Sequence, residues 1–575
     1  MHNNRLWNKF MKFPIFFNKT FEAIKQFVSN NITFIIVMVC CNLPVLITYE
    51  NVWNKFELFS YIFAVNTLVA LLFSAIPWKR VRLSVKIFII VLSVLSFYLD
   101  AYFSMIYNGV PDQSVIEIVL ETNPAEALGY IKAYMMNIWL YVVFVVSLLV
   151  LFAIMRYAGN LRNIRGVITG ISLFIMFGTI MALVKIVSEK MNRDMTTYRH
   201  VRYEACSVLG KTLFLIKAIS SQNAISKMEN KTAKPNILKN ESSIPYVVYI
   251  LGESFSRHHL GLYGYHLDTT PLLDAKEKQG NLIKFTDVIS SEPVTRKSLA
   301  KMFTFYRRGM KGEWYENTDL FTILRAAGYH TTWISNQEYS GKHANTAHFY
   351  AKRCNENAYT MYRQMNSYTL SEPHDETMLP YLDSTLIKSH KKNFVLLHMI
   401  GAHQLYSARY PESRRKFTTA MEFGSNDMVK SEKADYDNAV LYNDSVINEI
   451  INRFENKNAI VIFTPDHGED VMEINLKAPG HYELNPNVHM VEIPMMIWVS
   501  NKFQAAYPEL VARIRRSKDR PFMTDDMIHT LLDLIQIRTK EFNERLSLIN
   551  DKYDTKRVRY CGDKIYQRKE KRLSN

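Results

Sequence analysis

Residues 459–470 read AIVIFTPDHGED, an apolar run that ends directly in a cluster of acidic and histidine side chains. Two earlier stretches repeat this design: YVVYIL (246–251) precedes Glu253, and NFVLLHMI (393–400) precedes His403. Short continuous apolar runs of this length are typical of strands buried on both faces of a sheet. We therefore expect three buried strands, each followed by a chemically reactive residue.

Further strands and helices alternate around these three. HTTWIS (330–335) and IPMMIWV (493–499) are also expected to be strands, whereas 318–328 and 436–454 have helical patterns. Alternation of this kind predicts an α/β domain with a mainly parallel central sheet, which we place at residues 244–540. In such sheets ligands bind beyond the carboxyl ends of the strands, where the reactive residues would gather.

The residues at these strand ends are suited to binding a metal ion. Glu253, Asp466 and His467 offer carboxylate and imidazole ligands, which Zn²⁺ and Mn²⁺ accept. Each residue alone would more often be an ordinary loop residue. Their joint placement at strand ends favours a metal site, with His403, His481 and His489 as neighbouring candidates.

A nucleophile has to come from another segment, because the chain has no G-x-S-x-G turn. Residues 290–299 (SSEPVTRKSL) have the pattern of a loop entering a helix, with Thr295 near the helix start. Backbone N–H groups there attract phosphate, and a metal on the hydroxyl would lower its pKa and activate it. Thr295 could equally be a simple helix cap, and Ser291 and Ser298 are alternative nucleophiles.

The first 190 residues have a different character. Five long apolar runs, at about 32–49, 59–78, 87–107, 136–155 and 167–187, approach the ~20 residues that a transmembrane helix needs. Basic loops alternate with acidic ones, which predicts a cytoplasmic N-terminus and a large outer domain. We expect a five-helix transmembrane domain at 1–190, with Asp100 and Lys185 near the outer ends of two spans.

The remaining segments are polar or basic. We expect a linker at 191–243 and a loosely ordered basic tail at 541–575. The net charge of +16 suits an anionic partner, but an outward-facing domain excludes nucleic acid. The five cysteines lack metal-binding spacing and allow at most one bond among Cys206, Cys354 and Cys561.

The motifs GESFSRHHLGLYGYHLDTTPLL, SSEPVTRKSLAKMFTF, LLHMIGAHQLYSARYP and TPDHGED, behind five apolar spans, resemble the phosphoethanolamine transferases of Gram-negative bacteria. These are inner-membrane enzymes with a sulfatase-like periplasmic domain of the alkaline-phosphatase superfamily. The resemblance implies that Glu253, Thr295, Asp466 and His467 bind zinc and that Thr295 becomes phosphorylated. It also implies that His403 contacts the phosphoryl group or a second metal. His481 or His489 would bind substrate, as would Thr122 and Glu126 in the outer loop.

The implied reaction moves phosphoethanolamine from phosphatidylethanolamine to lipopolysaccharide, with the core sugars favoured over lipid A as acceptor. It would require one or two zinc ions, with Mn²⁺ as the alternative metal. Two other functions stay open. The protein could transfer phosphoglycerol to a periplasmic glycan, or it could be a non-catalytic membrane protein that binds an envelope component.

Overall fold

The structure is a computed structural model. It describes residues 30–48, 52–121, 208–229, 234–338, 346–361 and 373–568, apart from 108, 389 and 484, together with isolated positions within 22–27 and 131–153. The predicted spans at 136–155 and 167–187 lie almost wholly outside these ranges, and Thr122, Glu126, Lys185 and Cys206 lie outside them entirely. The chain forms two compact units, of which the second contains residues 219–575.

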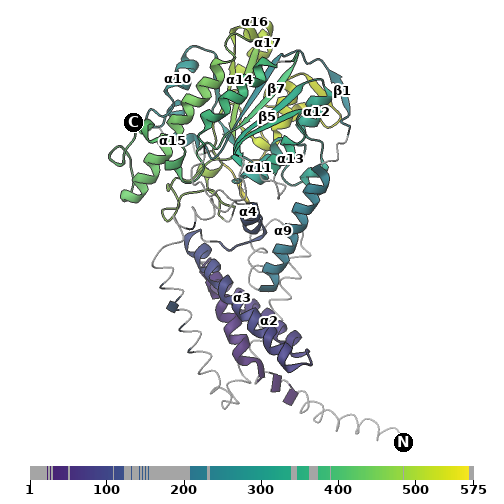
Figure 1. The fold of residues 1–575 in the computed structure, drawn as a ribbon, viewed down its shortest axis with the longest axis vertical. Helices are drawn as coiled ribbons and strands as arrows, with labels where there is room; N and C mark the ends of the chain where they lie inside the picture. The colour runs from purple at the N-terminus through teal and green to yellow at the C-terminus, as the bar shows by residue number, and fades with distance from the viewer. Residues whose placement is uncertain are drawn as a thin grey trace, which may run out of the picture. The chain divides into compact units, whose positions relative to one another are not determined.

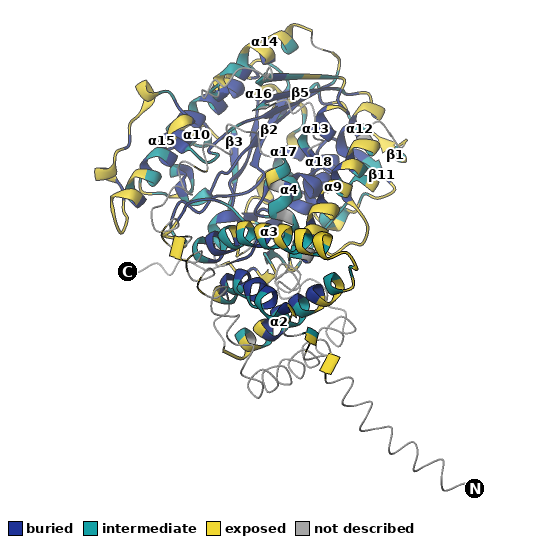
Figure 2. Cartoon of the chain, turned by 60° about the horizontal axis from the view of Figure 1, so that its bottom comes forward, coloured by how far each residue is buried: buried dark blue, intermediate teal, exposed yellow. Residues whose placement is uncertain are grey.

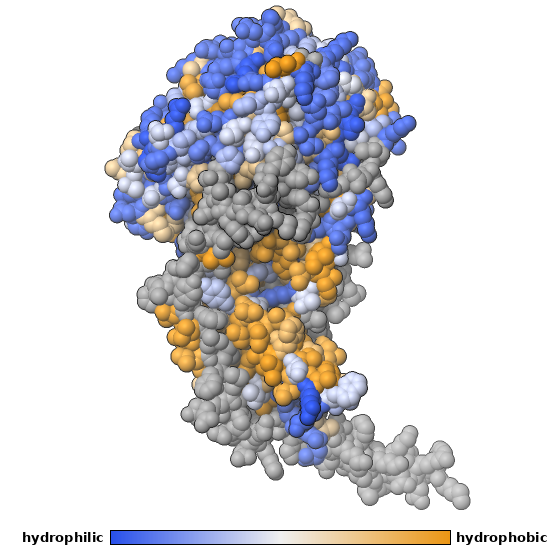
Figure 3. Space-filling model, in the orientation of Figure 1, coloured by the Kyte–Doolittle hydropathy of each residue, from blue (hydrophilic) through white to orange (hydrophobic). Residues whose placement is uncertain are grey.

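Two helices of the first unit are long and apolar enough to cross a membrane. These are α2 (Val52–Ser74) and α3 (Lys79–Ile106), and they coincide with the second and third predicted spans. The helix at Asn30–Cys41, where the first span is predicted, is shorter and leads into the 3-10 helix η1 (Leu43–Thr48). Hydrophobic side chains cover the surface over α2 and α3 (Figure 3). Two of the five predicted spans therefore satisfy the length criterion among the described residues, and α4 (Gln113–Glu121) follows them.

The second unit is built around a seven-stranded sheet with strand order β3-β9-β8-β2-β7-β5-β6 (Figure 1). The strands are β2 (Tyr246–Gly252), β3 (Leu282–Phe285), β5 (His330–Glu338), β6 (Glu356–Met361), β7 (Asn393–His398), β8 (Ala459–Pro465) and β9 (Met495–Val499). β8, β2, β7, β5 and β6 are mutually parallel, whereas β9 runs antiparallel to β8 and β3. The five predicted strands are confirmed, and the sheet is mixed because of β9.

Helices cover both faces of this sheet. One face packs against α11 (Thr295–Met302), α12 (Leu320–Ala326), α13 (Thr346–Ala351), α16 (Asn501–Ala506), α17 (Pro508–Arg516) and α18 (Met527–Leu534). The other packs against α10 (Pro271–Lys278), α14 (Leu379–Ile387) and α15 (Asp427–Asn452). The central strands β2, β7 and β8 are buried along almost their whole lengths (Figure 2), as expected for runs without polar alternation, whereas the edge strand β6 is partly exposed. Both predicted helices are confirmed, as α12 and within α15.

Smaller strands join the outer parts of the domain. β1 (Ile237–Asn240) pairs with β11 (Ile537–Thr539), β4 (Val288–Ile289) with β10 (Phe522–Met523), and β12 (Tyr560–Cys561) with β13 (Lys564–Ile565). Helix α9 (Val208–Glu229) and β1 both lie inside the segment that the composition suggested as a linker. That segment therefore contains regular structure over much of its length.

The C-terminal segment is not a loose tail, contrary to the prediction. Arg557 makes ion pairs with the buried carboxylates of Asp525 and Asp526, and Arg559 binds Asp287 at 2.8 Å. Tyr566 donates a hydrogen bond of 2.6 Å to Glu492. A basic composition predicts side chains that lie in solvent, but these cations instead neutralise acidic groups of the domain interior. The structure thus fixes this segment as far as residue 568.

Candidate active site

The two parallel strands β2 and β8 bring three of the predicted residues together. Gly252 is the register partner of Pro465 at the last pair of the two strands. Glu253 and Asp466 therefore leave the sheet side by side, and His467 follows directly. All three side chains are at most 1% exposed, so the site begins as a dry pocket at the carboxyl edge of the sheet.

Thr295 reaches this pocket from a different part of the chain. It is the first residue of α11, whose N-terminal N–H groups have no partner within the helix. Its Oγ1 lies 3.3 Å from both carboxylate oxygens of Glu253 and 3.2 Å from His467 Nε2. A hydroxyl, a carboxylate and an imidazole are thus gathered around one point.

Asp466 completes a group of four ligand atoms, whose other three belong to Glu253, Thr295 and His467. Its Oδ1 accepts hydrogen bonds from the backbone N–H groups of His467 and Ser254, at 2.8 and 3.3 Å. Its buried Oδ2 has no hydrogen-bond partner among the described residues and lies 3.3 Å from His467 Nε2. His467 Nε2 is also 3.3 Å from Glu253 Oε1. A tetrahedral zinc ion with bonds of about 2.0–2.1 Å separates its ligand atoms by about 3.3 Å, so this spacing fits the ion.

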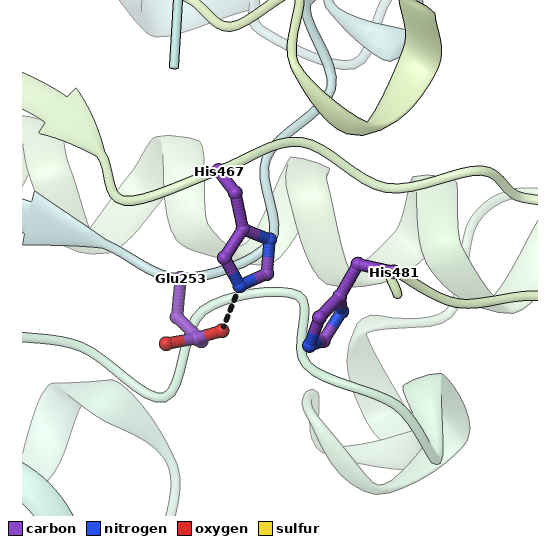
Figure 4. A group of neighbouring side chains, drawn as sticks. All are labelled: Glu253, His467 and His481. Atoms are coloured by element: carbon purple, nitrogen blue, oxygen red, sulfur yellow. Dashed lines mark ion pairs between the residues drawn. The ribbon is translucent and has the colours of Figure 1, made fainter. Parts of the chain in front are cut away.

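The imidazole of His467 is oriented for this role. Its Nδ1 lies 2.8 Å from the carbonyl oxygen of Gly468. A proton on Nδ1 satisfies that contact and leaves the Nε2 lone pair directed at Glu253 and Thr295. Figure 4 shows His467 and Glu253 pointing toward each other, with His481 beside them. One ligand atom from each of Glu253, His467 and His481 lies within 4.8 Å of the other two, so His481 is next to the four-atom group.

The charges in this pocket are strongly coupled. Burial raises the pKa of Asp466, and the negative charge of Glu253 raises it further. Burial alone would also raise the pKa of Glu253, but its hydrogen bond to His467 and the His467 charge hold that pKa well below its ordinary value. Burial opposes a charge on His467, yet Asp466 and Glu253 raise the pKa of His467 to about 10. Two carboxylates in a dry site require positive charge, which a divalent cation can supply.

Backbone conformation also shapes the pocket. Ser254 has a φ of 62°, which is costly for a residue with a side chain, and its Oγ donates to Glu253 Oε1 at 2.9 Å. Gly401 has a φ of 59°, and a Cβ atom there would lie 2.5 Å from the carbonyl oxygen of Glu253. Both positions hold Glu253 in place, and the second requires glycine.

Two supporting residues were missed by the sequence reasoning. Glu469 is fully buried, accepts a 2.6 Å hydrogen bond from the Tyr406 hydroxyl and lies 2.7 Å from His481 Nδ1. Gln337 donates to Glu253 Oε2 at 3.3 Å and to the carbonyl of Met399 at 3.1 Å. Glu469 belongs to the Asp-His-Gly-Glu run, whose last residue was the available signal. Gln337 gave no signal, because it becomes a neighbour only when β5 and β7 pair.

The other predicted residues divide into two groups. The ring of His403 lies 5.9 Å from that of His481, so His403 is at the edge of the site. His489 is elsewhere: its ring lies 4.5 Å from His258, and its Nδ1 lies 4.0 Å from Glu473. Of the two alternatives, the structure therefore brings His481 and not His489 to the four-atom group.

Neither alternative nucleophile has its hydroxyl hydrogen-bonded to Glu253 or His467. Ser298 donates a 2.6 Å hydrogen bond to the carbonyl oxygen of Asp466, so its hydroxyl supports the backbone. The buried Ser291 hydroxyl has no hydrogen-bond partner among the described residues. Thr295 is the hydroxyl that the structure places between Glu253 and His467.

Comparison with known families agrees with this geometry. Residues 245–537 match the sulfatase family model, which is about half of the chain. Residues 65–200 match the model of phosphoethanolamine transferase EptA/EptB. The first match contains the whole pocket, and the second contains the long apolar helix α3.

Individual relatives agree with these matches. Phosphoethanolamine transferase EptC of Escherichia coli is 30% identical over 59% of this chain and 58% of its own length. The chain thus aligns with less than two thirds of that relative. Phosphoethanolamine transferase CptA of Salmonella typhimurium is 27% identical over 82% of this chain and 83% of its own.

Two solved structures have the same fold. The C-terminal periplasmic domain of E. coli EptC, solved as a zinc complex, is 30% identical, with a TM-score of 0.54 over 58% of this chain and 94% of that one. Integral membrane lipooligosaccharide phosphoethanolamine transferase A of Neisseria meningitidis is 21% identical, with a TM-score of 0.63 over 90% of this chain and 97% of that one. The chain therefore belongs to the sulfatase family and joins its sulfatase domain to an N-terminal domain of the phosphoethanolamine transferase EptA/EptB type.

Proposed function

We propose that this protein is a membrane-anchored phosphoethanolamine transferase with Thr295 as its nucleophile. The observation that carries the proposal is the position of Thr295 Oγ1, 3.2–3.3 Å from His467 and Glu253. A helix cap needs only its own backbone as a partner. A hydroxyl held between a carboxylate and an imidazole from two other segments is instead suited to covalent catalysis.

Glu253, Thr295, Asp466 and His467 would hold one zinc ion, as their spacing permits and as the zinc complex of the E. coli EptC domain supports. When bound, zinc would lower the pKa of the threonine hydroxyl and stabilise negative charge on the phosphoryl oxygens. Ser254 and Gln337 hold Glu253 through hydrogen bonds of 2.9 and 3.3 Å. Glu469 holds His481 in the same way. These supports preorganise the pocket.

The first half-reaction releases diacylglycerol. Thr295 Oγ1 forms a bond to the phosphorus of phosphatidylethanolamine, and the bond from phosphorus to the diacylglycerol oxygen breaks. The threonine gives its proton to the Glu253 carboxylate, to which it donates at 3.3 Å, and His403 supplies one to the departing oxygen. The product is a phosphoethanolamine ester on Thr295.

The second half-reaction transfers this group to lipopolysaccharide. A hydroxyl of a core sugar gives its proton to His403, and its oxygen forms the new bond to phosphorus. The bond to Thr295 breaks, and the threonine recovers its proton from Glu253. His481, beside the group, would contact the phosphoryl oxygens, and the net charge of +16 suits an acceptor rich in phosphate.

The donor is a membrane lipid, so apolar helices that cross the membrane would keep the enzyme next to its donor. We propose a bacterial inner-membrane protein that crosses the bilayer five times, with a cytoplasmic N-terminus and a periplasmic catalytic domain. Thr122 and Glu126 would contact the donor head group. The positions of the basic loops in the sequence support this topology.

The test compares lipopolysaccharide from cells that express the wild-type chain, Thr295→Ala or Ser291→Ala. Mass spectrometry should show one added phosphoethanolamine unit with the wild type and with Ser291→Ala, and none with Thr295→Ala. Ser291 is the matched control because its hydroxyl is buried in the same loop without a hydrogen-bond partner among the described residues. Modification that persists in Thr295→Ala would refute the nucleophile.

The adduct on Thr295 separates the alternatives. A peptide containing Thr295 should carry phosphoethanolamine, which contains an amine. Phosphoglycerol on the same residue would instead indicate a phosphoglycerol transferase. A purified protein without zinc and without any adduct would indicate a non-catalytic envelope-binding protein.

A further inference from the structure

The hydrophobicity of helix α9 changes along its length: its first half is mostly apolar, and its second half is polar. Its first half, residues 208–219, reads VLGKTLFLIKAI, and its second half reads SSQNAISKME. Twelve residues of helix extend about 18 Å, which is too short to cross a bilayer core of ~30 Å. Apolar helical segments of this length are either buried in a protein core or lie in a membrane interface.

Exposure decides between these two possibilities. Four large aliphatic side chains of the first half are 40–53% exposed, namely Leu213, Leu215, Ile216 and Ile219. Phe214 and Ala218 lie on the buried side of the helix, at most 3% exposed. A core helix would not present so many aliphatic side chains outward, and water is an unfavourable environment for them.

An ion pair determines the depth of this segment. The Lys211 ammonium contacts the Asp100 carboxylate and the Ser96 hydroxyl, both on α3. Asp100 lies about 31 Å along α3 from Lys79 at 1.5 Å per residue, close to the full thickness of the hydrocarbon core. The Lys211–Asp100 pair would therefore lie at the outer boundary of the hydrocarbon. Burying either charge alone there would be costly, so the pair disfavours separation of α9 from α3.

The helix α3, to which Lys211 binds, has an exposed apolar surface of its own. α3 exposes Leu83, Ile87, Phe88, Val91, Leu95 and Leu99 by 45–61%, as a membrane-spanning helix does. Leu99 is adjacent in sequence to Asp100, to which Lys211 binds. The exposed aliphatic side chains of α9 thus belong to a segment that is tied to a span with an apolar surface.

From these observations we infer that residues 208–219 of α9 lie in the outer interface of the phospholipid bilayer, anchored at that depth by Lys211 and Asp100. The partner is the layer of phospholipid head groups and upper acyl chains. The inference rests on the membrane placement of α3 and not on the transfer chemistry.

The test uses the full-length protein reconstituted in vesicles of phosphatidylethanolamine and brominated phosphatidylcholine. Leu213→Trp and Ile216→Trp should add fluorescence that the brominated lipid quenches at least about twofold more than that added by Ile387→Trp. Ile387 is 86% exposed on α14 and is the matched control. Equal quenching at all three positions would overturn the inference.

Charge reversal tests the anchor separately. In the Leu213→Trp background, Asp100→Lys or Lys211→Asp alone should reduce quenching, and the two together should restore it. Quenching that is insensitive to either single change would overturn the role of the ion pair. These fluorescence measurements do not depend on transfer activity, so failure of the proposed function and failure of this inference can be told apart.

Discussion

The Oδ2 atom of Asp466 is buried beside Glu253 with no hydrogen-bond partner among the described residues, a costly arrangement without a cation. In Asp466→Asn we expect zinc affinity to fall at least about tenfold. The chelated wild-type protein should lose about 2.7 kcal/mol relative to protein with zinc at a hundredfold excess over its Kd. Chelation should cost the variant at most about 1.4 kcal/mol, because the same zinc concentration is then at most tenfold above its Kd.

The measurement is the melting temperature of the full-length protein in detergent, with and without a chelator, together with its zinc content. Asp383→Asn is the control, since Asp383 forms an ion pair with Arg453 at the surface. A variant that binds zinc as tightly as the wild type would remove Asp466 from the metal site.

We expect His259 to contribute to stability in a pH-dependent way, away from the proposed metal site. Its Nδ1 lies 2.6 Å from Asp437, and its Nε2 lies 3.0 Å from Glu473. Burial opposes its charge, but these two carboxylates outweigh burial and raise the pKa of His259 to about 10. A raised folded-state pKa stabilises the fold fully below the unfolded value of about 6.5, and this stabilisation is lost as pH rises toward 10.

The free energy of unfolding should therefore fall between pH 6.5 and 10, by up to about 1.4 kcal/mol per pH unit from this group. His259→Gln should be less stable at pH 6.5 and should lose most of that slope. Denaturant unfolding across the pH series measures both effects, with the exposed His390→Gln as control. An unchanged slope in His259→Gln would mean that this histidine is neutral in the folded state.

At the scale of elements, the loop after β7 has to pass very close to the end of β2. Gly401→Ala should reduce transfer activity and zinc content together, because its Cβ would meet the Glu253 backbone at 2.5 Å. Gly264→Ala is the matched control: it has a φ of 86° but no atom within 4 Å of the added Cβ. Both should lose about 1–2 kcal/mol for the left-handed backbone. Only Gly401→Ala should also disturb the pocket.

The comparison is made by zinc content and by lipopolysaccharide mass at equal protein levels. If both alanine variants had the same zinc content and transfer activity, the close packing of Gly401 against Glu253 would not affect function.

The local pattern of apolar and polar residues was sufficient to predict most strands of the sheet and the residues at their ends. Glu253, Asp466 and His467 follow apolar runs directly, so the ends of the strands could be placed from sequence. The direction of β9 could not, because a strand buried on both faces has the same composition whichever way it runs. The contact between Glu469 and His481 depends on the fold of the loop that joins them, which no periodicity describes.

At the scale of the whole molecule, the basic C-terminal segment illustrates another limit of composition. Its cations bind carboxylates that are far away in the sequence, such as Asp525 and Asp287. Positive charge alone therefore indicated a solvated tail. Its partners became visible only once the chain was folded.

This arrangement makes Arg557 a critical residue for the stability of the catalytic domain. It forms ion pairs with Asp525 and Asp526, whose side chains are fully buried. Arg557→Ala leaves both carboxylates without this cation, so we expect a loss of about 3–5 kcal/mol. Lys552→Ala should cost at most about 1 kcal/mol, because its pair with Glu544 is exposed. Denaturant unfolding of the two variants measures the difference. Similar losses in both would show that the segment contributes only surface charge, whereas a large loss confined to Arg557→Ala would make residues 551–568 part of the folded domain.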